Sequence, residues 1–350
     1  MVDQMMMKAV RLHAAKSDLS VDSAPVPQPG PDDVLLKVEA AGICHSDVNY
    51  RDGVAPVARM PITLGHEFAG TVAAKGAGAT AGVEVGDRVC VHYVVSCGTC
   101  GYCASGMETY CERYRMIGKD VDGGFAEFAC VPARNVLKVP PSLPFEQAAI
   151  LGCAVSTAFH ALRRGRVREG ETVLVNGAGG LGLQAIQLAS RVFGAGRVVA
   201  VDVSDAKLEL AARFGADSTV NAGDPGAGDR IRELTNGRLA DVALDFVGRR
   251  STVESLLGWT GKGGRLVVVG ISSESVTLSP YTALIGKETE MVGVDDHLRS
   301  ELVELVRLVG SGTLDLSRSI THRLKLEEVN LGMRMLREQT GNPVRIVVTN

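Results

Sequence analysis

The second half of the chain repeats one unit, which consists of an apolar strand, a glycine-rich turn and a helix. The unit begins with the run TVLVN, continues through the turn GAGGLG and the helix-like stretch LGLQAIQLASRVFG, and returns to a second apolar strand, RVVAVD. Strands that are apolar at every position, rather than at alternate positions, are typical of parallel strands covered by helices on both faces. The pattern therefore predicts a doubly wound parallel sheet.

The glycine turn predicts a site for a dinucleotide. Gly177, Gly179 and Gly182 follow an apolar strand directly and open a helix, which is the context that makes this motif specific. Backbone amides that carry no side chain approach a pyrophosphate closely, and the positive end of the helix faces it. The next strand ends in Asp202, whose carboxylate would accept hydrogen bonds from ribose hydroxyls and repel the 2′-phosphate of NADP. NAD is therefore the expected cofactor.

The expected cofactor-binding residues belong to this turn, to the strand that follows it and to the next helix. Asp202 could also be a solvated residue at the end of a strand, and Lys207 could flank the ribose or lie on the helix surface. The residues of this region that we expect to bind the cofactor are Gly177, Gly179, Gly180, Leu181, Gly182, Asp202 and Lys207.

The first part of the chain has a different pattern. From Ala9 to about Val139, short runs rich in β-branched and apolar residues alternate with Gly, Pro, Asp or Asn, which is typical of an irregular β-rich domain. After about Asp295 an amphipathic helix, SELVELVRLVGSG, and an apolar strand, PVRIVVT, follow without another glycine turn. A chain of 350 residues has room for two domains of roughly 150 residues, and its last segment is free to rejoin the first.

Composition excludes several classes of function. A formal charge of -3 and the lack of a basic cluster leave nothing to neutralise the phosphates of a nucleic acid or an anionic membrane. No apolar stretch reaches the ~18 residues of a membrane span, and the first residues do not show the basic and then apolar regions of a secretory signal. We expect a cytoplasmic protein that acts on a small molecule, without nucleic-acid or membrane partners.

Four of the eight cysteines crowd into one window and predict a metal site. Cys97, Cys100, Cys103 and Cys111 are interleaved with glycines, which let the loop wrap around one ion. In a reducing compartment, closely spaced thiols hold a metal more often than they form disulfides. Four thiolates leave no open coordination position, so the site is expected to be structural, and zinc suits tetrahedral sulfur. An iron–sulfur cluster has the same ligand count and stays an alternative.

A second group of possible ligands is dispersed along the chain. Cys44 stands in AAGICHSD, His66 in LGHEFAG and Cys153 in ILGCAVST. Their spacing alone is weak evidence, because a buried cysteine is commonly a small inert hydrophobe and a lone histidine is commonly a satisfied core residue. Taken one at a time, these residues do not identify a metal site.

The order of the motifs is more specific than any one of them. GICHSD, GHEFAG, the four-cysteine loop and the glycine turn follow one another along the chain, and in this order they resemble the zinc-dependent medium-chain alcohol dehydrogenases from about Met7 to the C-terminus. The resemblance implies an α/β protein with a chaperonin-10-like (GroES-like) β-rich catalytic domain over residues 1–150, which carries both zinc sites. It also implies a Rossmann NAD-binding domain over 151–295 and a segment, 296–350, that returns to the catalytic domain.

The resemblance assigns roles around the second metal. The catalytic zinc ligands would be Cys44, His66 and Cys153, with a fourth place left for water or substrate. Asp47 would orient His66. Glu67 would lie near the metal and approach it when the substrate position is empty.

The same resemblance implies contacts with the cofactor and a path for the proton. His45 and Arg345 would meet the pyrophosphate and Val269 would line the NAD site, although His45 and Arg345 could instead be surface residues. Ser46 would bridge the substrate oxygen and the nicotinamide ribose. Some relatives end the proton path in a histidine five positions after the first zinc cysteine, but this chain has Asn49 there, which is not a base near neutral pH. We therefore expect His45 or ordered water to take the proton.

The implied activity is hydride transfer between a primary or secondary alcohol and NAD, with reduction of an aldehyde or ketone in reverse and two zinc ions per chain. The nearest alternative is a polyol or amino-alcohol dehydrogenase, although such relatives often carry an acidic residue where this chain has Cys153. A metal-free quinone or enoyl reductase and a thiol-based redox sensor are further alternatives. The strand at about 290–294 resembles the edge through which such enzymes form dimers or tetramers.

Several remaining residues are expected to have structural roles. Tyr93 could line the substrate pocket by its position in the family or be a core aromatic residue. The residues expected to be structural are Cys90, Cys130, His13, His160, His297 and His322.

Overall fold

The fold is that of a computed structural model, which describes residues 5–79 and 82–350. The chain forms two compact units. Unit 1 runs to Ser156 and resumes with His297–Asn350, and unit 2 is Thr157–Asp296. The first boundary lies later than the one expected after residue 150, so Cys153 belongs to the unit that begins the chain. Among the described residues, no helix has the length and apolar character needed to cross a membrane.

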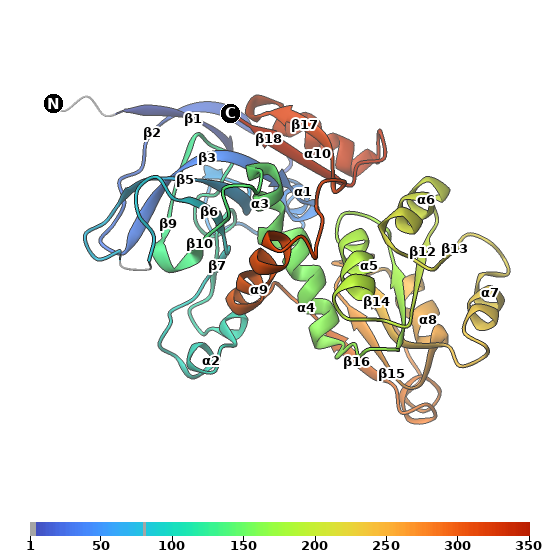
Figure 1. The fold of residues 1–350 in the computed structure, drawn as a ribbon. Helices are drawn as coiled ribbons and strands as arrows, with labels where there is room; N and C mark the ends of the chain where they lie inside the picture. The colour runs from blue at the N-terminus through green and yellow to red at the C-terminus, as the bar shows by residue number, and fades with distance from the viewer. Residues whose placement is uncertain (1–4, 80–81) are drawn as a thin grey trace. The chain divides into compact units, whose positions relative to one another are not determined.

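Unit 2 is a sheet of parallel strands in the order β13-β12-β11-β14-β15-β16, connected largely through helices (Figure 1). This arrangement confirms the doubly wound sheet predicted from the apolar strands. The inner strands bury almost every side chain, as expected when helices cover both faces. The elements are α4 Ser156–Arg164, β11 Thr172–Asn176, α5 Gly182–Arg191, β12 Arg197–Asp202, α6 Asp205–Phe214, β13 Ser218–Asn221, α7 Ala227–Leu234, β14 Ala240–Asp245, α8 Arg250–Trp259, β15 Thr260–Val268, the π-helix η4 Tyr281–Ile285 and β16 Glu290–Gly293.

The strand order of unit 2 reverses at β11. From β11 the chain moves outward through β12 and β13, and it then crosses to β14, β15 and β16 on the other side. In doubly wound sheets, ligands bind beyond the carboxyl ends of the strands at such a point. The glycine turn follows β11 and Asp202 ends β12, so both lie at this edge.

Unit 1 is β-rich, and its main sheet joins strands from both ends of the chain. The order β10-β6-β5-β3-β18-β17 places the C-terminal strand β18 antiparallel to β3, and β9 pairs with the other part of β3 (Figure 1). Smaller sheets have the orders β2-β1-β4 and β7-β8. The strands are β1 Met6–Leu12, β2 Ser20–Pro25, β3 Asp33–Ile43, β4 Ile62–Thr63, β5 Glu67–Lys75, β6 Arg88–Val91, β7 Val94–Val95, β8 Arg115–Met116, β9 Phe128–Pro132, β10 Val136–Lys138, β17 Ile320–Lys325 and β18 Arg345–Thr349.

Helices fill the connections of unit 1 and carry several of the expected site residues. One buried hydrophobic core extends through the unit, and it includes Cys44, Tyr93 and Cys153. Two of the three expected catalytic zinc ligands, Cys44 and Cys153, therefore lie within the packed interior. The helices are α1 His45–Arg51, α2 Gly101–Ala104, η1 Glu108–Tyr110, η2 Ala133–Asn135, α3 Phe145–Ile150, the π-helix η3 Leu151–Val155, α9 Arg299–Gly310, η5 Leu326–Glu328 and α10 Val329–Glu338.

Candidate metal and dinucleotide sites

Three residues from distant parts of unit 1 converge in its core. Cys44 directly precedes α1, His66 directly precedes β5, and Cys153 lies in η3. One ligand atom from each lies within 4.8 Å of the others, and all three residues are buried. Ligand atoms around a tetrahedral zinc ion lie roughly 3.5 to 3.8 Å apart, so the structure brings together a donor set that fits one ion.

Asp47 organises two of these three residues. The buried Asp47 carboxylate accepts the backbone N–H of Cys44 (2.9 Å) and of Gly65 (3.2 Å), and its Oδ1 lies 3.4 Å from Nδ1 of His66. The carboxylate thus faces the Nδ1 edge of the imidazole ring. Both ring nitrogens of His66 are buried and neither makes a hydrogen bond with the described residues, so Asp47 acts on the ring through its charge, and Nε2 is the nitrogen that does not face it. A buried imidazole nitrogen without such a partner is a suitable metal donor.

Cys153 is placed by a π-helix that the sequence pattern did not predict. Residues 151–155 form a wide helical turn between α3 and α4. A Cβ at Gly152 would lie 2.7 Å from the carbonyl oxygen of Val91, so only glycine lets this turn pack so closely against β6. Short π-helical turns are frequent at functional sites because they redirect one side chain. Here the redirected segment carries the thiol.

The two thiols and the imidazole influence one another's protonation. A hydrogen bond from Cys153 lowers the pKa of Cys44 well below its ordinary value, and the same bond, with burial, raises the pKa of Cys153. Burial opposes protonation of His66, but the charges of Asp47 and Cys44 outweigh it and raise its pKa. Metal ligands must be unprotonated, and a thiolate is already favoured at Cys44. Three ligands would leave the fourth tetrahedral position open, which is the pattern of a catalytic site.

Glu67 connects this site to the last strand of the chain. Its buried carboxylate accepts the backbone N–H of Ala154 (2.9 Å) and a hydrogen bond from the guanidinium of Arg345. A Cβ at Gly42 would overlap this carboxylate, so the arrangement requires glycine there. Burial raises the pKa of Glu67, and the charge of Arg345 opposes that shift.

The predicted roles of Glu67 and Arg345 are constrained by this pair. An approach of Glu67 to a metal would require one of its two hydrogen bonds to open. The Arg345 side chain is buried and is only 3% exposed, so a contact with cofactor phosphates would have to share its guanidinium with Glu67. Both roles stay predictions.

The four cysteines of the second cluster also come together. Their sulfur atoms lie within 4.8 Å of one another, and individual separations are 3.9 Å between Cys97 and Cys103, 3.5 Å between Cys100 and Cys103, and 4.0 Å between Cys100 and Cys111. Four sulfurs around one zinc ion lie about 3.8 Å apart. In a polynuclear iron–sulfur cluster the four thiolates are divided between two or more irons, which would spread some of the sulfurs further apart. The geometry therefore favours one ion.

Backbone amides of the four-cysteine loop point at its sulfurs. Sγ of Cys97 accepts the N–H of Thr99 (3.4 Å) and of Cys100 (3.3 Å), and Sγ of Cys111 accepts the N–H of Cys97 (3.2 Å) and of Arg113 (3.3 Å). The Thr99 N–H is the main cause that lowers the pKa of Cys97 to about 4, whereas burial raises the pKa of Cys111 to about 11. Such amides stabilise thiolates that bind a metal.

The glycine turn of unit 2 has the shape of a phosphate cradle. Gly177 has a φ of +90°, which favours glycine. A Cβ at Gly182 would overlap the carbonyl oxygen of Gly177, whereas a Cβ at Gly179 would meet no atom within 4 Å. Gly182 therefore permits close packing of α5 on the turn, and Gly179 leaves its backbone open to a ligand. These are the distinct roles that glycines have in a dinucleotide-binding turn.

Asp202 holds the turn through its carboxylate. Oδ2 accepts the N–H of Ala178 (2.8 Å) and Oδ1 accepts the N–H of Ser204 (3.0 Å), and the residue is buried. The carboxylate thus joins the end of β12 to the glycine turn, and each oxygen retains a lone pair for a ribose hydroxyl.

The other expected cofactor residues lie at the same ends of the strands or on unit 1. In unit 2, Leu181 directly precedes α5, Lys207 lies half-buried on α6, and Val269 is half-buried just after β15. In unit 1, His45 is exposed as the first residue of α1, and Oγ of Ser46 lies 3.8 Å from Sγ of Cys44. Their contacts with a cofactor or substrate, and that of Gly180, stay predictions.

A buried cluster of rings beside His66 was missed by the sequence reasoning. Tyr93 lies edge-on to His66, with ring centroids 5.1 Å apart, and edge-on to His297, at 4.9 Å. Nδ1 of His92 lies 2.9 Å from Nε2 of His297. The two histidines are 205 positions apart in the chain, so no local pattern links them. The only local signal is a histidine inside the otherwise apolar run VCVHYVV.

His92 makes the stability of the protein depend on pH. Burial, reinforced by the positive charges of Arg299 and Arg134, lowers its pKa to about 3; His297 and Glu108 also face it. In the unfolded chain His92 has an ordinary pKa and binds a proton below about pH 6.5. In the folded chain it binds this proton only below about pH 3. Stability from this group is therefore complete above pH 6.5 and falls as the pH drops toward 3, by at most about 1.4 kcal/mol per pH unit.

We expect His92→Asn to remove this dependence while keeping a nitrogen or oxygen near the position of Nδ1. The free energy of unfolding, measured by urea denaturation at pH 7, 6 and 5, should fall more steeply for the natural protein than for the variant. His322→Asn, which changes a less buried histidine of β17, is the control. Parallel slopes for the natural protein and His92→Asn would contradict the prediction.

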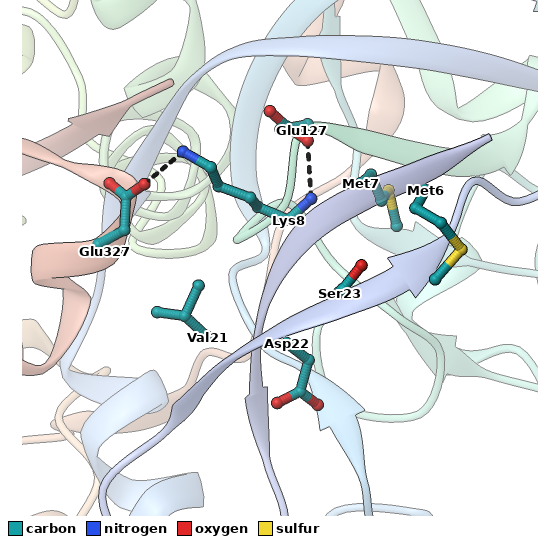
Figure 2. Close-up of a pocket in the computed structure, with 8 residues that line it drawn as sticks. All are labelled: Met6, Met7, Lys8, Val21, Asp22, Ser23, Glu127 and Glu327. Atoms are coloured by element: carbon teal, nitrogen blue, oxygen red, sulfur yellow. Dashed lines mark hydrogen bonds and ion pairs between the residues drawn. The ribbon is translucent and has the colours of Figure 1, made fainter.

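A hollow of about 350 Å³ on unit 1 contains none of the expected site residues (Figure 2). It lies over β1 and β2, where Lys8 forms an ion pair with Glu327 (2.7 Å) and its backbone N–H bonds Glu127. Its lining residues are Met6, Met7, Lys8, Val21, Asp22, Ser23, Glu127 and Glu327. The convergence of donors, rather than this surface hollow, marks the chemistry of unit 1.

Two sequence families match the two parts of the chain. The alcohol dehydrogenase GroES-like domain matches residues 30–141, and the zinc-binding dehydrogenase family matches residues 180–311. The first match contains two of the three convergent residues and the whole four-cysteine loop. The second covers most of the parallel sheet.

Complete proteins are similar to the chain as well. It is 35% identical to an alcohol dehydrogenase of Geobacillus stearothermophilus (98% of this chain and 100% of that protein) and 30% identical to a sorbitol dehydrogenase of Bacillus subtilis (98% and 97%). The solved structure of a candidate zinc-binding dehydrogenase of Sinorhizobium meliloti 1021, bound to NADP, superposes with a TM-score of 0.90 at 31% identity, over 99% of this chain and 100% of the other. With both metal-ligand clusters and the glycine turn in place, the chain belongs to the zinc-dependent medium-chain alcohol dehydrogenase family.

Proposed function

We propose that the protein is a zinc-dependent oxidoreductase that transfers a hydride between a primary or secondary alcohol and NAD, and reduces an aldehyde or ketone in the reverse direction. The observation that carries the proposal is the convergence of Cys44, His66 and Cys153, which supply three donors and leave a fourth position for a substrate oxygen. The four-cysteine loop would hold a second, structural zinc ion. Small alcohols or carbonyl compounds are the proposed substrates.

Each residue of the catalytic unit would contribute one defined step. Bound by the three ligands, zinc would act as a Lewis acid and lower the pKa of a substrate hydroxyl. Asp47 would hold the Nδ1 edge of His66, so that Nε2 stays directed at the ion. Ser46, beside Cys44, would accept the hydroxyl proton and pass it on. Once that proton has left, the substrate carbon can give its hydride to nicotinamide C4.

The exit of the proton is proposed to run through His45 or ordered water. Asn49, at the position where some relatives have histidine, cannot take a proton near neutral pH. His45 is exposed and neighbours Ser46, so its imidazole can exchange protons with the solvent. If neither His45→Ala nor Asn49→His changes the pH profile of hydride transfer, both side chains lie outside the path.

NAD rather than NADP is the proposed cofactor, because the Asp202 carboxylate would lie against a 2′-phosphate. We expect Asp202→Asn to raise kcat/KM with NADP by about tenfold, since a repulsion of about 1.4 kcal/mol is removed, while the amide oxygen can still accept one of the two backbone N–H groups. Initial rates with NADH and NADPH and one carbonyl substrate measure this change. Asp224→Asn, an exposed carboxylate before α7, is the control; an unchanged preference in Asp202→Asn would contradict the assignment.

The substrate class is tested with a panel of alcohols. Primary and secondary alcohols, sorbitol and an amino alcohol are assayed with NAD and NADP, and zinc per chain is counted by mass spectrometry. The sorbitol dehydrogenase relative supports a polyol dehydrogenase as the alternative, whereas the thiol of Cys153 favours simple alcohols. Two zinc ions and turnover of simple alcohols are expected. One zinc ion without alcohol turnover would instead support a reductase with a structural metal only.

The cellular setting and assembly are part of the same proposal. All eight cysteines lie among the described residues and none of them forms a disulfide, which fits a reducing compartment such as the cytoplasm. β16 ends the sheet of unit 2, and its Met291 is 42% exposed. Pairing through this edge would give a dimer or a tetramer, which light scattering on the purified protein distinguishes from a monomer.

A further inference from the structure

Tyr93 occupies the centre of a buried group of imidazole rings in unit 1. The plane of its ring is nearly perpendicular to the rings of His66 and His297, with interplanar angles of 79° and 81°. It is closer to parallel with the ring of His92, at 24°. Tyr93 is 2% exposed and His297 is 0% exposed. The metal-ligand candidate His66 therefore contacts a ring that is itself packed against two other histidines.

The two histidines are fixed by their own neighbours. His92 donates its backbone N–H to the carbonyl of Asn135 (2.7 Å), and the Asn135 amide donates to the carbonyls of His92 (2.6 Å) and Val94 (2.8 Å). These bonds clamp the backbone on both sides of Tyr93. The side-chain bond between His92 Nδ1 and His297 Nε2 (2.9 Å) then joins this connection between β6 and β7 to the start of the C-terminal segment.

The chain that follows His297 leads to both expected metal centres. The backbone N–H of Arg299, at the first turn of α9, donates to the Glu108 carboxylate within the four-cysteine loop (2.5 Å). The same helix packs against η3, the π-helix that carries Cys153. His297 thus lies at a junction between the four-cysteine loop, the helix of Cys153 and the ring beside His66.

Two simpler roles for the histidine pair do not fit its geometry. It is not a third metal site, because its possible ligands do not converge on one point. His92 faces His297 with Nδ1, whereas its other nitrogen, Nε2, faces the Glu108 carboxylate at 3.8 Å. It is also not a charged relay, because a proton on both rings would place two positive charges in contact near Arg299 and Arg134. One neutral ring donates and the other accepts.

We propose that His92 and His297 are positioning residues of the catalytic metal site, whose mutual hydrogen bond holds Tyr93 against His66 and so keeps Nε2 of His66 directed at the metal. The inference deepens the proposed function and rests on it, because it takes Cys44, His66 and Cys153 as the ligands. Asp47 holds the ring at one edge, across a distance of 3.4 Å. The edge-on contact with Tyr93 limits rotation of the same ring.

The test compares two substitutions of His297 in the full chain. His297→Leu removes the hydrogen bond, whereas His297→Gln retains an amide group at about the position of Nε2. We expect His297→Leu to weaken zinc binding at the catalytic site by about tenfold, the lower end of the effect of residues that support metal ligands. With cobalt(II) as the probe, its visible absorption bands from this site should shift. The four-cysteine loop should keep its metal, and His297→Gln should restore both readouts.

Metal retention against a chelator and the cobalt spectrum are measured with no substrate present, and His322→Leu serves as the control. If the natural protein holds one metal per chain, the proposed function fails and the inference fails with it. If it holds two and His297→Leu retains both with an unchanged spectrum, the positioning role alone is overturned. If His297→Leu does not fold, Tyr93→Leu tests the same link and should cause the same loss; normal retention there would overturn the proposal.

Discussion

Cys153→Ser should lower the rate of alcohol-dependent NAD reduction by about a thousandfold or more and leave the binding of NAD unchanged. A Lewis-acid metal supplies several kcal/mol of stabilisation to the developing charge on the substrate oxygen, and about 4 kcal/mol corresponds to a thousandfold in rate. The substitution exchanges a thiolate, which zinc would bind strongly, for a serine hydroxyl, which stays protonated at neutral pH and would bind zinc weakly. The measurement is kcat with a saturating alcohol, together with zinc per chain, which should fall from two to one.

Cys90→Ser is the matched control for this variant. Cys90 is also fully buried in unit 1, in β6, and burial raises its pKa to about 12, so it is an inert thiol outside either cluster. Its substitution should retain turnover and both zinc ions. Unchanged turnover in Cys153→Ser, with two zinc ions still present, would remove Cys153 from the ligand set.

Gly182→Ala should weaken the binding of the dinucleotide strongly. The new Cβ would overlap the carbonyl oxygen of Gly177, so the turn must open and its amides can no longer converge on a pyrophosphate. Two lost hydrogen bonds to a charged group cost roughly 3 kcal/mol or more, which corresponds to about a hundredfold in Kd. Quenching of intrinsic fluorescence by NADH measures the change.

Substitutions of two further glycines distinguish a loss of the dinucleotide site from a loss of the folded structure. A Cβ at Gly179 would meet nothing within 4 Å, so Gly179→Ala should leave the thermal unfolding temperature unchanged and weaken only the binding of the dinucleotide. Gly258, exposed within α8 and without near neighbours for a Cβ, should gain about 0.5 to 1 kcal/mol of stability as alanine and bind NADH normally. Normal NADH binding by Gly182→Ala would contradict the assigned role of the turn.

The features that sequence alone could predict are those encoded over short stretches. Apolar strands and one glycine turn were sufficient for the doubly wound sheet of unit 2, because strand burial and turn geometry depend on adjacent residues. The four-cysteine cluster is equally local. In contrast, Cys44, His66 and Cys153 come from three separate elements, and only the order of motifs along the chain, through a family resemblance, grouped them.

What the sequence could not show depends on packing between distant segments. Nothing in LGCAV distinguishes a π-helix from an α-helix, because the helix takes this form where Gly152 packs against β6. Arg345 was expected at the cofactor phosphates, but its buried partner is Glu67, on a strand that is remote in sequence. His297 was expected to have a structural role, and its bond with His92 emerges only when the last segment joins unit 1.

Unit 1 is interrupted by unit 2, and this order has a consequence for synthesis on the ribosome. The strand β18 that pairs with β3, and the Arg345 that bonds Glu67, lie within the last six residues of the chain. Domains generally fold as they emerge, and every residue of unit 2 is made before β18, so unit 2 can reach its native form while the main sheet of unit 1 still lacks this strand. The unit that is encoded first is therefore completed only after the unit that interrupts it.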